Sequence, residues 1–503
     1  MSQVHVGYLH TMALHIWGIV GFSAILGAVF VLGRAFYNVF FHPLSKIPGP
    51  KLCAATDFIV AYHFLSGRYP FYIKSLHDKY GTVVRIGPNQ LSFSSASSWQ
   101  DIYGHSYRRK LFPKSTFYSY GARHLGNELD PQRHSEMKRK LSHGFSVKAL
   151  SEQEDIVHNY LDKFIRQINV YAAGPKGDEM VKWYNFFTFD LIGDLAFGEP
   201  FGSLNDAKPH FWVSLLLGNV KAIAWRSVSR WFPVFDKLGV WTAPKSVMKM
   251  RDEHMEYSRK KIIQRMNTKT TRRDLLSGQF GPNGPGMTIP ELSAQASLFI
   301  TAGSETTATF LSGLTYHLLK NPRVYNLLVE EIRSAYNTYE DITDIKASQL
   351  KYLSAVMDEG FRMYPPIGVG LYRLSPGETV DGMYIPKGVE LSTNPWSTCR
   401  SPENFHNPDE FKPERWLDPD CTDKKHASQP FGLGSRVCIG RNLATKETRL
   451  VLSKMLWVYD MELVNKDIDL DRDSTNYFLW SKPEIWVKFA RRRGVQVPIL
   501  DSE

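Results

Sequence analysis

The chain has 503 residues, of which 43% are hydrophobic and 22% charged, and a formal net charge of +11. This is the composition of an ordinary globular protein. The basic residues are spread along the sequence apart from Arg491–Arg493, so nucleic acid is a less favoured partner than an anionic membrane surface or an acidic protein. Four scattered cysteines exclude a disulfide framework and a zinc pattern, and they indicate thiols in a reducing compartment.

The N-terminal stretch contains no Asp, Glu, Lys or Arg before Arg34. Ala13–Leu32 is an apolar run of about 20 residues, which is long enough to span a bilayer. A cleaved signal peptide would need a basic segment and a shorter apolar core, so we predict a retained membrane anchor over residues 1–33, with its span at about 13–32. Basic residues follow this run and none precedes it, so the positive-inside rule puts the remainder of the chain in the cytosol.

A proline-containing segment follows the anchor. Phe41–Pro50 reads FHPLSKIPGP, and its prolines exclude helix and sheet, which predicts a stiff hinge over residues 34–50. Length alone suggests about three domains, but no break in the sequence supports a division of residues 51–503. The glycine-rich stretch Gly278–Gly286 is better interpreted as a surface loop than as a linker.

Several elements of the first half can be predicted from local patterns. Thr82–Ile86 and Gln90–Phe93 form a predicted hairpin, and Tyr103–Leu129 is predicted to be a loop. Pro131–Phe145 is a predicted basic helix. Trp183–Phe201 and Pro209–Trp241 are rich in aromatic residues and can be either plain core or a lid at the membrane surface; the sequence does not choose between them.

Thr288–Lys320 is the strongest helical pattern. Thr288 and Glu291 form a capping box, and Asn321-Pro322 ends the helix, whose length of about 46 Å crosses a whole domain. Its middle reads AGSETT over residues 302–307. A glycine in the interior of a helix lowers the stability of the helix by about 1 kcal/mol relative to alanine. The threonine can bond back to the preceding turn beside a solvated Glu305, or the motif can be functional.

A second helix, Ser348–Met363, carries Glu359 and Arg362 at a spacing of three, so the two side chains can pair. Most pairs of this kind are surface bridges. Short strands are predicted at Gly370–Leu374, Thr379–Tyr384 and Val389–Ser392, with turns at Asp381-Gly382 and Pro386-Lys387-Gly388. The stretch Pro413-Glu414-Arg415-Trp416 follows them.

Phe431–Gly440 reads FGLGSRVCIG and leads into a predicted helix, Asn442–Tyr459. Glycines surround Cys438, and a helix N-terminus favours a thiolate over a thiol. A lone thiolate among backbone donors suits one axial bond to a metal cofactor. The alternative is an inert, buried cysteine.

The pattern FxxGxRxCxG is fully met in Phe431–Gly440 and resembles the haem-binding signature of the cytochrome P450 family. The resemblance extends from Phe41 to the C-terminus, and the amino-acid sequence of the hinge resembles that of membrane-bound members from filamentous fungi. It implies a mainly α fold with small β-sheets, the cytochrome P450-like fold, preceded by one transmembrane helix. It also implies that residues 51–503 form a haem-thiolate catalytic domain that binds haem b.

The resemblance carries over to individual residues. Cys438 would be the metal ligand of the haem iron, and Thr306 with Glu305 would be the catalytic alcohol and acid. Glu359, Arg362 and Arg415 would form a buried structural lock behind the haem. The other expected cofactor-binding residues are Phe431, Gly434, Arg436, Gly440, Arg373, His134, Lys138, Ala302 and Gly303. Of these, Arg436, Arg373 and Lys138 would neutralise the haem propionates.

The implied activity is that of a monooxygenase, which uses O₂ to oxidise a lipophilic substrate, such as a terpenoid or polyketide of fungal secondary metabolism. The chain has no complete dinucleotide fingerprint or flavin segment, so electrons would come from NADPH–cytochrome P450 reductase at the endoplasmic reticulum membrane. Basic residues near the cysteine loop could steer this partner: Arg139, Lys140, Arg441, Lys446 and Arg449. The alternatives are a desaturase or multi-step oxidase without net oxygen insertion, and a non-catalytic, membrane-tethered basic scaffold.

Overall fold

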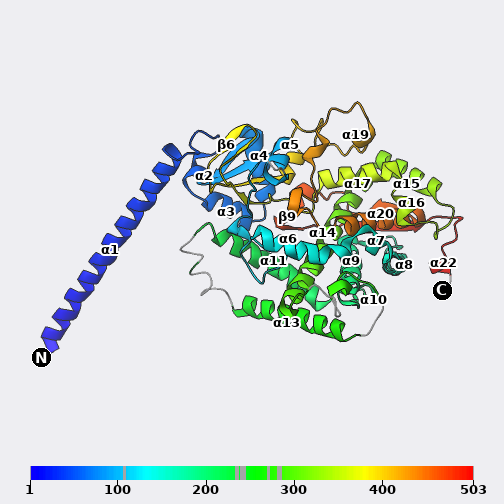
Figure 1. Ribbon diagram of the computed structural model, residues 1–503, viewed down its shortest axis with the longest axis horizontal. Coiled ribbons are helices and arrows are strands. Elements are labelled where there is room, and N and C mark those ends of the chain that lie inside the picture. The colour runs from blue at the N-terminus through cyan, green and yellow to red at the C-terminus, as the bar shows by residue number, and fades with distance from the viewer. Residues whose placement is uncertain are drawn as a thin grey trace.

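The computed structural model describes residues 2–105, 109–232, 237, 245–268, 272–279 and 286–501. The described chain is mainly helical with small sheets, as the sequence predicts (Figure 1). The longer helices are α1 (Ser2–Phe40), α3 (Phe58–Leu65), α4 (Tyr69–Tyr80), α5 (Ala96–Tyr103), α6 (Pro131–Leu141), α8 (Glu154–Tyr171), α9 (Met180–Phe197), α11 (Phe211–Ser229), α13 (Lys245–Asn267), α14 (Ile289–Lys320), α15 (Pro322–Ala335), α17 (Lys351–Met363) and α20 (Arg441–Val458). The shorter ones are α2 (Lys51–Ala55), α7 (Val147–Ser151), α10 (Ser203–Asp206), α16 (Asp344–Ala347), α18 (Pro395–Cys399), α19 (Glu414–Leu417), α21 (Leu470–Asp473) and α22 (Pro498–Asp501).

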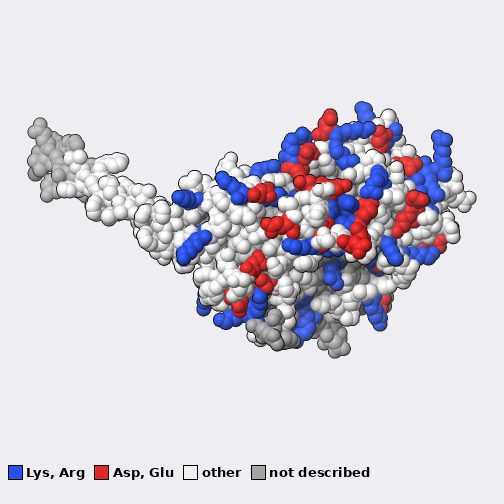
Figure 2. Space-filling view, turned by 90° about the horizontal axis from the view of Figure 1, so that it is seen from above, with Lys and Arg blue, Asp and Glu red and all other residues white. Residues whose placement is uncertain are grey.

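Helix α1 projects from the body of the molecule as a single long rod (Figure 1). Its stretch Leu14–Phe40 is long and apolar enough to cross a membrane, and the most apolar part of this stretch is not buried against the protein. Figure 2 shows the contrast between this apolar rod and the charged surface of the body. The helix continues through residues 34–40, which we predicted as part of the hinge, because the first proline comes only at Pro43.

The segment after α1 is held tightly against the first strand. The buried guanidinium of Arg85 donates to the carbonyl oxygens of Asn38, at 2.9 Å, and Pro88, at 2.6 Å. The backbone amide of Arg85 donates to the carbonyl of Pro48 at 2.8 Å. A Cβ atom on Gly49 would lie 2.3 Å from the Arg85 carbonyl oxygen, so only glycine fits there. The end of α1 is therefore fixed to the body of the molecule through Arg85.

A four-stranded sheet joins distant parts of the chain. The predicted N-terminal hairpin is β1 (Val83–Gly87) and β2 (Gln90–Phe93). Strand β7 (Glu390–Thr393) pairs in parallel with β2, and β4 (Arg373–Leu374) pairs antiparallel with β7. The predicted segment Thr379–Tyr384, with its predicted turn at Asp381-Gly382, is a hairpin of β5 (Glu378–Val380) and β6 (Met383–Ile385), and both turn residues have positive φ.

The C-terminal part forms two further small sheets. Strand β11 (Trp486–Arg491) lies between β3 (Asp178–Glu179) and β8 (Tyr459–Leu463), and β9 (Thr475–Tyr477) forms a hairpin with β10 (Leu479–Ser481). This arrangement returns the C-terminal segment to α14, so residues near 480 pack against the middle of that helix.

Helix α14 crosses the helical body (Figure 1). Its N-terminus has the predicted capping box, in which Thr288 and Glu291 exchange hydrogen bonds. It packs against α9, α13, α17 and α20, and most of its length is buried. The sequence left the aromatic segments that flank α14 as either plain core or a lid at the membrane surface. Trp183 and Trp212 are buried in the core, whereas Trp225 is 46% exposed. Trp241 lies outside the described residues.

Candidate active site

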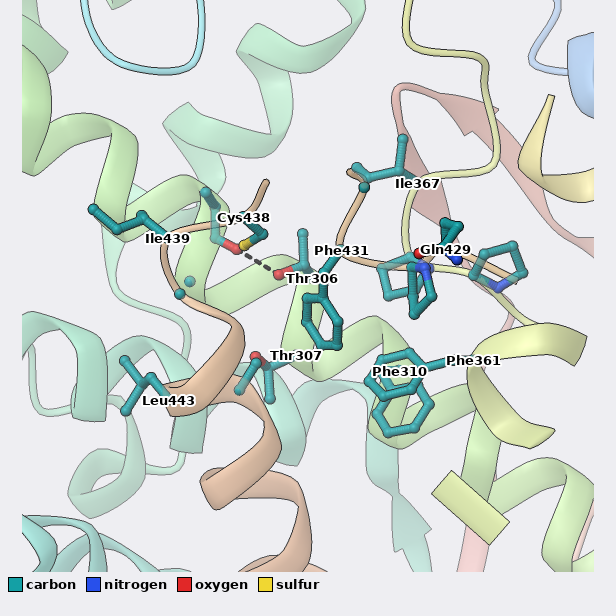
Figure 3. Close-up of a pocket in the computed structure, with 18 of the residues that line it drawn as sticks. Thr306, Thr307, Phe310, Phe361, Ile367, Gln429, Phe431, Cys438, Ile439 and Leu443 are labelled. Atoms are coloured by element: carbon teal, nitrogen blue, oxygen red, sulfur yellow. Dashed lines mark hydrogen bonds between the residues drawn. The ribbon is translucent and has the colours of Figure 1, made fainter. Parts of the chain in front are cut away.

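A cavity of about 330 Å³ lies between α14, the loop before α20 and the turn after α17 (Figure 3). Its walls are largely apolar, with Ile192, Leu298, Phe299 and Ile367 among them. Of the expected site residues, seven line it: Ala302, Gly303, Thr306, Phe431, Arg436, Cys438 and Gly440.

The loop that carries Cys438 is a rigid turn. The backbone amide of Cys438 donates to the carbonyl of Phe431 at 2.9 Å, which closes the loop. Gly434 has φ +70, and a Cβ atom there would lie 2.0 Å from the Tyr103 carbonyl oxygen, so no other residue fits. Gly440 is the N-cap of α20. The sequence therefore places Cys438 one turn before a helix N-terminus, as expected.

The thiol of Cys438 opens into the cavity and is accessible from it, although protein surrounds it. Burial raises the pKa of this thiol, and four contributions oppose the rise: the backbone amides of Gly440 and Arg441 and the charges of Lys138 and Arg441. The site therefore supplies donors for a thiolate but no adjacent base, which suits a sulfur that is ionised by coordination to a metal.

Three cations gather beside this loop: Arg373, which is buried, and Lys114 and Arg436, which are half-buried. They are here called the cationic cluster. Lys114 and Arg373 face each other across an isolated β-bridge. All their described hydrogen bonds go to backbone carbonyls, those of Arg436 to Glu128 at 2.7 Å and Leu129 at 3.0 Å. None of the three forms an ion pair with a carboxylate in the part of the chain that the structure describes.

The cations of the cluster repel one another. Burial, followed by the charges of Arg373 and Arg436, holds the pKa of Lys114 well below its usual range. Burial and Arg373 likewise lower the pKa of Arg436 to about 10. Only the Glu128 carboxylate acts in the opposite direction on both groups. The cluster therefore favours an added anion. Sequence analysis missed Lys114, because it lies in a segment without periodicity.

His134 and Lys138 lie on α6, next to the cysteine loop. Burial and then Arg436 lower the pKa of His134 to about 3, so its ring is neutral. The Lys138 ammonium donates to the carbonyls of Ser435, at 2.9 Å, and Val437, at 3.0 Å. In this structure Lys138 therefore holds the cysteine loop itself, whereas the sequence led us to expect that it reaches an external anion.

The motif in the middle of α14 is divided between two environments. Thr306 faces the cavity and donates to the Ala302 carbonyl (Figure 3). Glu305 does not line the cavity: its carboxylate pairs with the Lys482 ammonium, and both side chains are buried. The two residues are separated because adjacent positions on a helix point in different directions. The predicted acid–alcohol pair is thus not brought together at the cavity.

Glu447 is an acid at the cavity that sequence analysis missed. It lies on α20, is 3% exposed, and lines the cavity together with Thr307 of α14. Burial raises the pKa of its carboxyl to about 8. The signal in the sequence is its place on an otherwise apolar stripe of α20, four residues after Leu443 and four before Val451, both of which are buried.

Glu359, Arg362 and Arg415 meet in a buried network behind the cavity. Arg362 forms two hydrogen bonds of 2.8 Å with the Glu359 carboxylate. Arg415 donates to the same carboxylate at 3.1 Å and also pairs with Asp423. The side chains of all four are at most 2% exposed. This is an internal network and not a surface bridge.

Two of the expected steering residues are already paired. Lys446 is buried and forms an ion pair with Glu154 at 2.8 Å, and Arg449 pairs with Asp344 at 2.8 Å. The prediction that these two residues face a partner is therefore wrong. Arg139 and Arg441 remain exposed near the cysteine loop.

Comparison with known proteins identifies this arrangement. The family model for cytochrome P450 matches residues 57–489. The chain is 41% identical over 467 residues to the cytochrome P450 monooxygenase ORF9 of Penicillium roqueforti, covering 92% of each chain. It is 41% identical to the cytochrome P450 monooxygenase BOT4 of Botryotinia fuckeliana, covering 90% of this chain and 88% of that one. It is 38% identical to the cytochrome P450 monooxygenase astA of Talaromyces wortmannii, covering 92% and 95%. The chain belongs to the cytochrome P450 family.

Proposed function

We propose that this protein is a haem-thiolate monooxygenase in which Cys438 is the axial ligand of haem b. The cofactor class follows from the family, whose members bind haem b through a cysteine thiolate. The observation that carries the assignment of the residue is that Cys438 opens into an apolar cavity beside three cations that lack a carboxylate partner among the described residues.

The residues present fit the group. Haem b offers a flat apolar ring, an iron atom and two propionate carboxylates. The cavity offers apolar walls, one accessible thiol and Arg436, the member of the cationic cluster that lines it. The ring, the iron and the propionates therefore each have a suitable counterpart in the chain. Arg373, Arg436 and Lys114 would hold the propionates, and the lock of Glu359, Arg362 and Arg415 would support the loop from behind.

When bound, haem b supplies the binding and reductive activation of O₂. The chain supplies the environment for this chemistry. The closed turn from Phe431 to Cys438 holds the sulfur in place, and the apolar walls exclude water. Thr306 presents a hydroxyl to the cavity whose hydrogen is donated to Ala302, so its oxygen is left to accept a hydrogen bond.

The substrate that fits is lipophilic. The residues of α9, α14 and the turn after α17 that line the cavity are predominantly apolar, and Ile192, Leu298 and Ile367 are representative. Three similar proteins are fungal monooxygenases, and we infer a secondary metabolite, such as a terpenoid or polyketide, as the substrate. Desaturation and multi-step oxidation would use the same residues, so analysis of the products distinguishes them from hydroxylation. Family membership argues against a non-catalytic scaffold.

We further propose that α1 anchors the protein in the endoplasmic reticulum membrane, with the catalytic domain in the cytosol. The length and apolar surface of Leu14–Phe40 support this assignment. The hinge then reduces to residues 41–50. NADPH–cytochrome P450 reductase is the electron donor that suits this location, and the exposed Arg139 and Arg441 offer it a basic surface.

The test is the absorbance spectrum of the reduced, full-length protein with carbon monoxide. A thiolate-ligated haem gives a strongly red-shifted Soret band, and Cys438→Ala should abolish this band and the activity. Cys399→Ala is the matched control, because Cys399 also lines the cavity but is almost fully buried. A red-shifted band that survives in Cys438→Ala and disappears in Cys399→Ala would overturn the assignment.

A further inference from the structure

We propose that Glu447 is the residue that holds an exchangeable proton at the cavity and passes it through the Thr307 hydroxyl toward the site of oxygen reduction. This inference rests on the proposed function, and it replaces Glu305 in the role of the acid. Glu447 would not touch the reacting oxygen and would act on it only through Thr307. It is therefore a positioning residue and not a catalytic residue.

Geometry distinguishes the two carboxyl groups. Glu447 lines the cavity, whereas Glu305 does not. Thr307, next to the cavity-facing Thr306, points toward α20 in Figure 3 and lines the cavity together with Glu447. A chain of two hydroxyls and one carboxyl therefore borders the same cavity, with members from both α14 and α20.

The two carboxyl groups also differ in charge. Glu305 lies against the buried ammonium of Lys482, which also donates to Thr309 at 2.8 Å. An ionised carboxylate accepts hydrogen bonds but has no proton to donate. Glu447 has no such partner, because it forms no ion pair among the described residues. Apart from burial, the only influence on its pKa among the described residues is the neutral Thr307 hydroxyl.

The charged groups on the elements around Glu447 are already engaged. On its own helix, Lys446 pairs with Glu154 and Asp344, and Arg449 pairs with Asp344. On α14, Glu305 pairs with Lys482. No cation is left among the described neighbours to stabilise an ionised Glu447. Burial therefore dominates and raises the pKa of this carboxyl to about 8, so it is mostly protonated at neutral pH.

The proposed proton transfer needs no reactant that the monooxygenase reaction does not already use. The O–H bond of Glu447 breaks as an O–H bond forms on Thr307, which in turn gives its own proton to a water in the cavity. That water protonates the oxygen that is being reduced by electrons from the reductase. The carboxylate that remains recovers a proton from solvent water. No reactant beyond O₂, electrons and water is required.

The first measurement is the infrared spectrum of the full-length, haem-loaded protein. The carbonyl band of a protonated carboxylic acid is separate from the bands of ionised carboxylates, and it shifts in heavy water when the proton exchanges. We expect one such band to titrate with a midpoint near pH 8 and to be absent in Glu447→Gln. Glu390→Gln is the matched control, because Glu390 is a buried carboxyl outside the cavity with a raised pKa, held by Ser115 and Trp231. Its substitution should leave the Glu447 band in place.

The second measurement compares NADPH consumed, peroxide released and product formed in the same reconstituted assay. A positioned proton donor is worth about 10²–10⁴-fold, so Glu447→Gln should lower product per NADPH at least about tenfold and raise peroxide. Glu447→Asp should restore part of the yield. In the unsubstituted protein the yield should fall as the pH rises through about 8, because the neutral acid is lost, and Glu447→Gln should remove this dependence.

Two results would overturn the proposal: an exchangeable carboxyl band with a midpoint near pH 8 that is unchanged in Glu447→Gln, or a product yield that stays matched to NADPH in that variant. If Glu447→Gln does not fold, Thr307→Val interrupts the same path and should give the same loss of yield, while unchanged coupling in it contradicts the proposal. A normal spectrum with carbon monoxide in these variants separates failure of the relay from failure of the proposed function.

Discussion

Two groups of arginine side chains, the lock and the cationic cluster, differ in how their charge is balanced. In the lock, Arg362 and Arg415 share the carboxylate of Glu359, and Asp423 pairs with Arg415. In the cationic cluster, Arg373 and Arg436 find only backbone carbonyls. The first group is complete within the chain, and the second is short of negative charge.

The difference indicates a difference in purpose. A buried cation is costly unless an anion lies beside it. The lock meets this requirement with its own carboxylates, so its role is to join α17 to the segment that follows α18. The cationic cluster does not meet it, so it is suited to bind an anion from outside the chain. Breaking one group should therefore affect folding, and breaking the other should affect retention of the cofactor.

The largest effect is expected for Glu359→Gln. This substitution removes the carboxylate on which both arginines depend and leaves their charges buried. Loss of one partner of a buried pair costs about 3–5 kcal/mol, so the variant should unfold at a much lower urea concentration and retain little haem. Urea denaturation of the purified protein measures the change.

A surface pair provides the control for this prediction. Lys74 and Asp78 form an ion pair at successive turns of α4, at 2.6 Å, and Asp78 is half exposed. Lys74→Met should change the free energy of unfolding by no more than about 0.5 kcal/mol, which is typical of exposed helical pairs. If both substitutions lower the free energy of unfolding by the same amount, the lock contributes no more to stability than a surface ion pair does.

An intermediate effect is expected for Arg373→Leu. Removing one of three mutually repelling cations should not destabilise the fold strongly, but it removes a partner for a propionate. Hydrogen bonds between charged groups contribute about 1.5–3 kcal/mol, so haem should transfer to an acceptor protein about 10 to 100 times faster. Stopped-flow absorbance during transfer to an excess of a haem-free globin measures this rate.

Arg85→Leu tests whether the effect is specific to the cluster. Arg85 is also a buried arginine bound to backbone carbonyls, but it joins β1 to the end of α1. Its loss should lower the stability of the fold and leave haem transfer unchanged. If both variants release haem at the same rate, the cationic cluster has no particular role in binding the cofactor.

Local patterns predicted much of this framework and missed what depends on distant contacts. Helix α14, its capping box and the pairing of Glu359 with Arg362 follow from spacings of three and four residues. The partner of Glu305 is Lys482, 177 positions away, and no periodicity connects the two. Lys114 and Glu447 became visible only when the fold brought unrelated segments to one cavity.

The same reasoning explains the errors near the membrane. The prolines of the hinge predicted its C-terminal part, but residues 34–40 contain none, and the helix continues through them. Lys446 and Arg449 read as a basic surface in the sequence, yet their carboxylate partners come from α8 and α16. Charge patterns in a sequence give the sign of a group but not its neighbours.

The smallest effect is expected for Lys138→Met, which tests the boundary of the cationic cluster. The two acceptors of Lys138, the carbonyls of Ser435 and Val437, belong to the chain itself, and Ser435 is exposed. Water can therefore replace the ammonium at one of them, and each lost hydrogen bond costs only about 0.5–1.5 kcal/mol. Haem transfer should accelerate less than about fivefold, well below the rate in Arg373→Leu, while Lys138→Arg should behave like the unsubstituted protein. If instead Lys138→Met releases haem as fast as Arg373→Leu does, Lys138 binds a propionate once haem is present, and the cationic cluster has four members rather than three.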